Sequence, residues 1–194
     1  MAKLGLSGTA EVEGRVLLVG LTGTSVQALG HRLSLGSKVS DSTTAHLESL
    51  APIDGSGILV TKVDGVTLSF WAIKSGVNTR KLWNHFYHSA DAVVLVVAGG
   101  SDPGDELDSA WTELTTDDKL LESGSELVVV IDAEGQHVTG TTTLDPSKRV
   151  APVKLTQLGM THDQMVRVDG TTGEGTEDLL KKLCDIIKER RTGK

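Results

Sequence analysis

Residues 14–36 read GRVLLVGLTGTSVQALGHRLSLG, and this stretch decides the fold. Its first part, Arg15 to Gly20, is a short apolar run that ends in glycine, which is typical of a buried parallel strand. Three apolar residues then recur at helical spacing: Val26, Leu29 and Leu33. They predict an amphipathic helix, and Thr24 and Ser25 are the candidate N-caps. A strand, a glycine turn and a helix in this order form the first unit of an α/β domain.

A hairpin is predicted further along the chain. ILVTKV (Ile58–Val63) and VTLSFWAI (Val66–Ile73) flank the dipeptide Asp64-Gly65. Asp-Gly between two apolar runs is the strongest short signal for a two-residue β-turn. The serine- and glycine-rich stretch before it, Gly36 to Gly57, is predicted to be a long loop.

Strands and helices alternate in the rest of the chain. We expect a short helix around Arg80–His88, a strand at Ala92–Ala98, a helix at Glu106–Leu121 and a strand at Glu126–Asp132. A polar loop at Gln136–Lys148, a weaker helix at Ala151–Met160 and a short strand at Met165–Val168 should follow. The C-terminal helix has an apolar stripe formed by Leu179, Leu180, Leu183, Ile186 and Ile187. This pattern predicts an α/β doubly wound fold with a mainly parallel six-stranded sheet and helices on both faces. We expect residues 1–13 to form an N-terminal extension, residues 14–191 the domain and residues 192–194 a tail.

The composition excludes several classes of protein. A chain of 194 residues with net charge −7 is an ordinary globular domain and is not expected to bind nucleic acid. Its single cysteine, Cys184, and its six histidines lack the paired spacings of a metal site. No apolar run approaches the roughly 20 residues that span a bilayer. Ala2 excludes N-myristoylation of the chain as given, so we expect no intrinsic membrane anchor and a cytoplasmic protein that reaches an organelle only through a partner.

Four segments resemble the Arf-like small GTPases. They are GRVLLVGL (14–21), LGHRLSLG (29–36), FWAIKSGVNTRKLWNHFY (70–87) and TGEGTEDLL (172–180). The third matches, without a gap, the family's third strand and switch II, and Trp71, Arg80, Leu82, Trp83 and His85 are family residues there. The resemblance implies the fold of small G proteins and P-loop NTPases, and it fixes where each nucleotide motif should lie.

The phosphate loop of the family reads G-x-x-x-x-G-K-[ST]. Its lysine reaches the β- and γ-phosphates, and its hydroxyl ligates Mg²⁺. The matching stretch here is GLTGTSVQ (Gly20–Gln27), which keeps Gly20 and has another glycine, Gly23. Ser25 stands at the second family glycine, Val26 at the lysine and Gln27 at the metal-binding hydroxyl. The resemblance therefore places no cation at the phosphates.

The other nucleotide motifs also differ from the family pattern. Ile53 stands at the switch I threonine that completes the magnesium shell. In switch II, normally W-D-x-G-G-Q, Ala72 replaces the Asp, Ser75 the second Gly, and Gly76 the Gln that orients the attacking water. In the guanine-specifying N-K-x-D motif, Ala133 replaces the Asn and Gln136 the Asp. Before the last helix, Asp169-Gly170-Thr171 stands where the family has Ser/Cys-Ala-x, so all five nucleotide motifs differ.

These substitutions together favour a pseudo-GTPase. Hydrogen bonds to charged groups contribute about 1.5–3 kcal/mol each. Losing the lysine, the metal shell and the base carboxylate therefore costs roughly 5–10 kcal/mol, or about four to seven decades of affinity. We expect no cofactor, no bound metal and no enzymatic activity. The alternative is a divergent Arf-like G protein that still binds GTP or GDP with Mg²⁺ and acts as a regulatory switch in trafficking.

Protein binding is the function that such a domain retains. The family docks its effectors on three aromatic residues of the inter-switch strands and switch II, and the matching positions here are Ser56, Trp71 and Phe86. Core packing is an equally good interpretation of Trp71 or Phe86 taken alone, and Trp83 is better explained as a core residue. Because four of the six aromatic residues, Trp71, Trp83, Phe86 and Tyr87, lie within residues 71–87, the sequence favours a partner surface there.

Overall fold

The computed structural model describes residues 12–24, 26–35, 56–99, 104–116, 118–132, 155–161, 164–169 and 173–193. Its sheet has six strands in the order β2-β3-β1-β4-β5-β6. The strands are β1 (Val12–Gly20), β2 (Ser56–Val63), β3 (Val66–Ile73), β4 (Ala92–Ala98), β5 (Glu126–Asp132) and β6 (Met165–Val168). Only the β2–β3 pairing of this sheet is antiparallel. The predicted doubly wound fold is confirmed.

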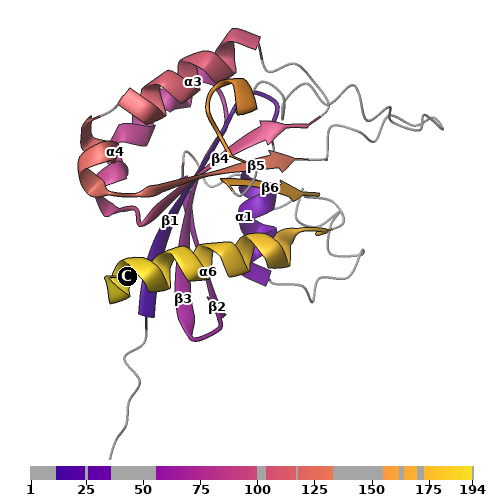
Figure 1. Ribbon diagram of the computed structural model, residues 1–194. Coiled ribbons are helices and arrows are strands. Elements are labelled where there is room, and N and C mark those ends of the chain that lie inside the picture. The colour runs from indigo at the N-terminus through magenta and orange to yellow at the C-terminus, as the bar shows by residue number, and fades with distance from the viewer. Residues whose placement is uncertain are drawn as a thin grey trace, which may run out of the picture.

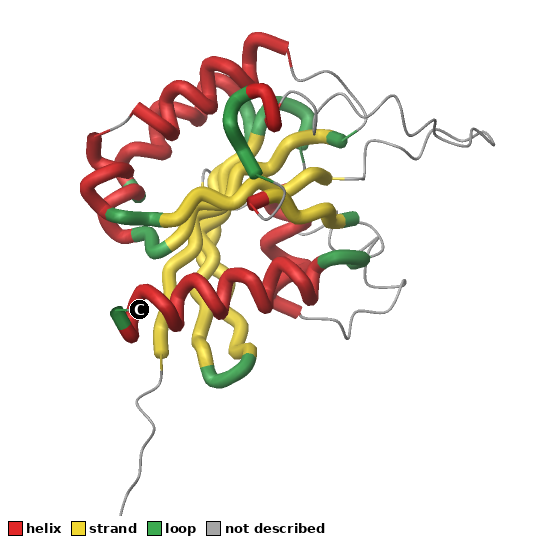
Figure 2. The backbone as a smooth tube through the Cα atoms, in the orientation of Figure 1, coloured by secondary structure: helices red, strands yellow, loops and turns green. Residues whose placement is uncertain are grey.

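Helices lie on both faces of the sheet, as Figures 1 and 2 show. One face packs against α1 (Val26–Leu35) and α6 (Thr176–Thr192). The other packs against α3 (Gly104–Thr116), α4 (Asp118–Ser123) and the 3₁₀ helices η2 (Val77–His85) and η3 (Tyr87–Ser89). Strand residues alternate between two hydrophobic clusters because successive side chains of a strand point to opposite faces.

The hairpin forms at the predicted turn. Asp64 (φ 50°) and Gly65 (φ 77°) both have positive φ, as a type I′ turn requires. The first strand starts earlier than expected, because Val12 and Glu13 pair with Val66 and Thr67 of β3. The sheet therefore begins before the expected domain boundary at residue 14.

Three predicted helices differ in the structure. The single helix expected over Glu106–Leu121 is two helices, and α3 ends where the Thr115 and Thr116 hydroxyls donate back to carbonyl oxygens of their own helix. The helix expected around Arg80–His88 is 3₁₀ and begins at Val77, after Gly76 (φ 128°). Of the helix predicted at Ala151–Met160, the described part is helical over residues 155–157 and then turns, with Met160 N–H donating to the Leu155 carbonyl oxygen.

The C-terminal helix is fixed to the sheet by a buried carboxylate. Asp91, whose side chain is 8% exposed, lies 3.1 Å from Arg191 Nη2 and 3.4 Å from Arg190 Nε. It also accepts a hydrogen bond from the backbone N–H of Arg15 (2.9 Å). The basic end of α6 thus joins the amino-terminal ends of β1 and β4.

Candidate functional site

The turn that follows β1 is closed by its own hydrogen bonds. Thr24 donates to the Leu21 carbonyl oxygen twice, from its N–H (3.1 Å) and from its hydroxyl (2.7 Å). Leu21 N–H donates to the Val96 carbonyl oxygen of β4 (3.2 Å). Gly23 (φ 84°) supplies the left-handed residue that this turn needs. The Thr24 hydroxyl is a candidate N-cap of α1, but its hydrogen bond to Leu21 closes the turn.

Val26 is a core residue. Its side chain is 1% exposed and belongs to the cluster that contains Leu29 and Leu33 of α1. A β-carbon built on Gly20 would lie 2.4 Å from Val26 Cγ2 and 2.3 Å from Thr24 Oγ1. The space above Gly20 is thus filled by the side chains of the turn itself. Gln27, the next residue, is half-buried.

Ala72 is also packed in the core. It is 2% exposed on β3 and joins the same cluster as Val26. A β-carbon built on Gly30 of α1 would lie 3.5 Å from Ala72 Cβ, which is ordinary contact. Val26 and Ala72 stand where the family has a cation and a carboxylate. Both instead make apolar contacts between the sheet and α1.

The start of the switch II segment is tied to the turn. The Ser75 hydroxyl donates to the Thr24 carbonyl oxygen at 2.7 Å. Gly76 follows with φ 128°, a backbone conformation that favours glycine. Ser75 and Gly76 thus act as backbone connectors between β3 and η2.

A carboxylate that the sequence analysis did not single out lies against the turn. Glu106 Oε1, at the start of α3, accepts hydrogen bonds from the Thr22 N–H (3.0 Å) and the Thr22 hydroxyl (2.9 Å). The same oxygen lies 3.4 Å from Arg80 Nη2. No spacing rule connects residues 22, 80 and 106, so only the arrangement of the sheet could bring them together. Among the described residues 20–24, 26 and 27, no side chain carries a positive charge.

Two aromatic rings form the predicted partner surface. Trp71 and Phe86 are both half-buried and meet edge to face, with ring centroids 5.4 Å apart. The Arg15 guanidinium carbon lies 5.9 Å from the centre of the Trp71 ring. Trp71 pairs with Ile58 of the edge strand β2, where Ile58 is 66% and Val60 56% exposed. We call Trp71, Phe86, Ile58 and Val60 the aromatic face.

The remaining aromatic residues of this segment are in the core. Trp83 is 1% exposed, as expected of a core residue. Tyr87 is fully buried, so the predicted partner surface includes neither Tyr87 nor Trp83. Ser56 lies in β2 opposite Ile73, but the structure does not describe its side chain. Ser25, Ile53, Ala133 and Gln136 lie outside the described residues.

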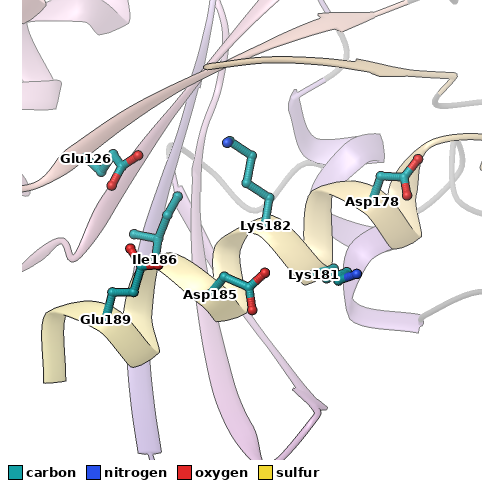
Figure 3. Close-up of a pocket in the computed structure, with 7 residues that line it drawn as sticks. All are labelled: Glu126, Asp178, Lys181, Lys182, Asp185, Ile186 and Glu189. Atoms are coloured by element: carbon teal, nitrogen blue, oxygen red, sulfur yellow. The ribbon is translucent and has the colours of Figure 1, made fainter. Parts of the chain in front are cut away.

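A shallow hollow of about 340 Å³ lies elsewhere, along α6 (Figure 3). It is lined by Glu126, Asp178, Lys181, Lys182, Asp185, Ile186 and Glu189. Glu126 is the first residue of β5, so the hollow lies at the amino-terminal end of that strand, whereas the turn after β1 lies at the carboxyl end of its strand. Its lining carries four carboxylates and two lysines.

Within the part of the chain that the structure describes, no group of three histidine, cysteine, aspartate or glutamate residues is placed to hold a metal ion. None of the described helices is both long enough and apolar enough to cross a membrane.

Known proteins resemble this chain in sequence and in fold. ADP-ribosylation factor J of Dictyostelium discoideum is 27% identical over 126 residues, which cover 64% of this chain and 61% of that protein. ADP-ribosylation factor-like protein 1 of Drosophila melanogaster is 24% identical over 193 residues, 96% of this chain and 95% of that protein. Among solved structures, the Arl6 BBS3 small GTPase of Trypanosoma brucei, with the bound nucleotide analogue GppNp, superposes with a TM-score of 0.62 at 18% identity and covers 91% of this chain and 98% of its own.

The chain also matches a profile of a whole family. The profile of the ADP-ribosylation factor family matches residues 2–187 and so spans every strand of the sheet. The Arl6 structure shares the architecture. The resemblance seen in the sequence is confirmed, and the chain belongs to the ADP-ribosylation factor family.

Proposed function

We propose that this member of the family is a pseudo-GTPase that binds protein partners constitutively and needs no guanine nucleotide. The observation that carries the proposal is the burial of Val26 at the position of the family's lysine. A lysine there reaches the phosphates, whereas a valine side chain packed over Gly20 offers neither charge nor space.

A bound Mg²⁺-nucleotide fits the described residues poorly. Ala72 stands where the family has the carboxylate that orders magnesium water, and it is buried against α1. The only charged group hydrogen-bonded to the described turn residues is the Glu106 carboxylate, which repels a phosphate. We therefore derive no hydrolytic step, and we propose that the protein does not turn over GTP.

The aromatic face is the proposed binding surface. Trp71 and Phe86 are partly exposed, and the strand beside them presents Ile58 and Val60 to solvent. Aromatic side chains at the centre of an apolar patch are typical anchors of protein interfaces. Because no nucleotide would reshape this face, binding would depend on expression and location alone.

Membership of the family supports a role in intracellular trafficking. We propose that the protein works in the cytoplasm and reaches an organelle through its partner.

Nucleotide content tests the proposal directly. Protein purified without added nucleotide is denatured, and the supernatant is analysed for GDP and GTP by ion-exchange chromatography. We expect less than one tenth of an equivalent of nucleotide, a margin that separates trace contamination from occupancy of a tight site. Stoichiometric GDP or GTP would instead establish the alternative, a divergent G protein that acts as a switch.

A further inference from the structure

One carboxylate oxygen joins two segments that are far apart in the sequence. Glu106 Oε1 accepts hydrogen bonds from the N–H and hydroxyl of Thr22 and lies 3.4 Å from Arg80 Nη2. Thr22 belongs to the turn after β1 and Arg80 to η2. Glu106 itself stands in the first turn of α3, so three elements meet at this oxygen.

Arg80 is held firmly at its end of the contact. Its Nη1 donates to the Ser109 hydroxyl (2.9 Å), and its Nη2 lies 3.4 Å from the Glu106 carbonyl oxygen. The guanidinium carbon lies 5.7 Å from the centre of the Trp83 ring. The side chain of Arg80 is 10% exposed and that of Glu106 23% exposed. Solvent therefore screens this ion pair less than it screens a pair on an open surface.

The segment that Arg80 belongs to has weak bonding of its own. η2 is a 3₁₀ helix of nine residues, whereas such helices rarely exceed four. Three of its buried polar atoms, Arg80 Nε, Trp83 Nε1 and Asn84 Oδ1, have no hydrogen-bond partner among the described residues. A helix of this kind depends on contacts with its neighbours to keep its conformation.

We propose that Thr22, Glu106 and Arg80 form a built-in latch that holds η2 against the turn after β1. The Ser75 hydroxyl, bonded to the Thr24 carbonyl oxygen, is a second tether at the start of the same segment. The latch does from within the protein what a bound ligand does in a switch: it orders η2, which ends next to Phe86, one of the residues of the aromatic face. The inference rests on the proposed function, since it explains how the face stays ordered without nucleotide.

If the latch holds η2 in place, substitutions at Glu106 and Thr22 should loosen η2. Glu106→Gln keeps the size of the side chain but removes its charge and weakens both contacts. Thr22→Val removes a hydroxyl that touches Glu106. Among the described residues, Thr22 makes no hydrogen bond to η2, so an effect on η2 must pass through Glu106. Asp105→Asn is the matched control, because Asp105 is exposed in the same first turn of α3.

The experiment is hydrogen–deuterium exchange by mass spectrometry on the full chain. We expect amides of Val77–His85 to exchange about tenfold faster in Glu106→Gln and about threefold faster in Thr22→Val, while amides of α6 keep their rate. Asp105→Asn should match the wild type. If Glu106→Gln does not fold, the exchange rate of Val77–His85 in Thr22→Val alone tests the latch.

Two results would overturn the latch. One is unchanged exchange of Val77–His85 in every folded variant, and the other is acceleration in α6 as large as in η2, which would make Glu106 a general stabilising residue. Failure of the latch and failure of the proposed function are distinguishable. If the wild type carries GDP but Glu106→Gln still accelerates exchange in η2, the proposed function is refuted and the latch stands. If the wild type is free of nucleotide and Glu106→Gln leaves exchange in η2 unchanged, the latch is refuted and the proposed function stands.

Discussion

The Val26 side chain lies directly over Gly20, with its Cγ2 2.4 Å from the point where a β-carbon on Gly20 would stand. The contact joins the last residue of β1 to the first residue of α1. It closes the turn on its apolar side, and it explains why Gly20 is required even if no phosphate approaches its backbone.

Restoring the family's lysine should therefore harm the fold. Val26→Lys buries a cation without a partner, which costs about 3–5 kcal/mol of unfolding free energy. Val26→Met has a side chain of nearly the same length without the charge, and we expect it to cost only about 1–3 kcal/mol. Urea denaturation of both variants measures the difference. Equal stabilities would show that the side chain reaches solvent and that the site is not closed.

The aromatic face should be separable from the core. Trp71→Ala and Phe86→Ala are each expected to abolish capture of a partner, since truncating an interface anchor costs about 2 kcal/mol or more. Each variant also loses the edge-to-face ring contact, so its melting temperature should drop by a few degrees. Pull-down and thermal melting are run on the same samples.

Trp83→Ala is the control for that experiment. Trp83 is 1% exposed, so its loss should cost about 3–5 kcal/mol and impair folding itself. Trp71→Ala behaving like Trp83→Ala would place Trp71 in the core and remove the basis of the aromatic face. Folded variants that keep every partner would place the working surface elsewhere.

Asp91 should contribute strongly to stability. Asp91→Asn removes a buried charge from two arginines, Arg190 and Arg191, which we expect to cost about 2–4 kcal/mol. The control is Asp185→Asn, because Asp185 is an exposed carboxylate on α6, the helix that carries both arginines. This substitution should change the free energy of unfolding by less than about 0.5 kcal/mol. Chemical denaturation compares the two, and similar losses would mean that the arginines do not hold α6 to the sheet.

Cys184 should be unreactive in the folded protein. Burial raises the pKa of its thiol, and its sulfur lies 3.6 Å from the Val63 carbonyl oxygen. Because the thiolate is the reactive form, a disulfide reagent at pH 8 should modify the native protein at least about a hundredfold more slowly than the urea-unfolded chain. Rapid labelling of native protein would show that α6 opens away from the hairpin.

The strands were predictable because their signals are local. The run Ala92–Ala98 and the Asp64-Gly65 turn indicate their structures without reference to the rest of the chain. The 3₁₀ geometry of η2 was not predictable, because the apolar spacing of a short segment does not distinguish a 3₁₀ helix from an α-helix.

The candidate site was predictable only in part. The helical spacing of Val26, Leu29 and Leu33 predicted an apolar face on α1, and Val26 is buried there. Glu106 was missed, since its contacts with Thr22 and Arg80 cross 84 and 26 positions of sequence. The prediction for Tyr87 was wrong because aromatic content does not show which rings of a segment face the core. Tyr87 is buried, whereas its neighbour Phe86 is partly exposed.

The central claim is that the protein works without guanine nucleotide, and isothermal titration with GTP, GDP and ATP in the presence of Mg²⁺ tests it most directly. Val26 and Ala72 supply no charge to a phosphate or a metal ion, so we predict no binding with a dissociation constant below about 10 μM. The melting temperature should likewise be unchanged by Mg²⁺-GTP, because only a ligand that binds the native state stabilises it. A titration that saturates at one equivalent of GTP or GDP with a dissociation constant below about 1 μM would contradict the account.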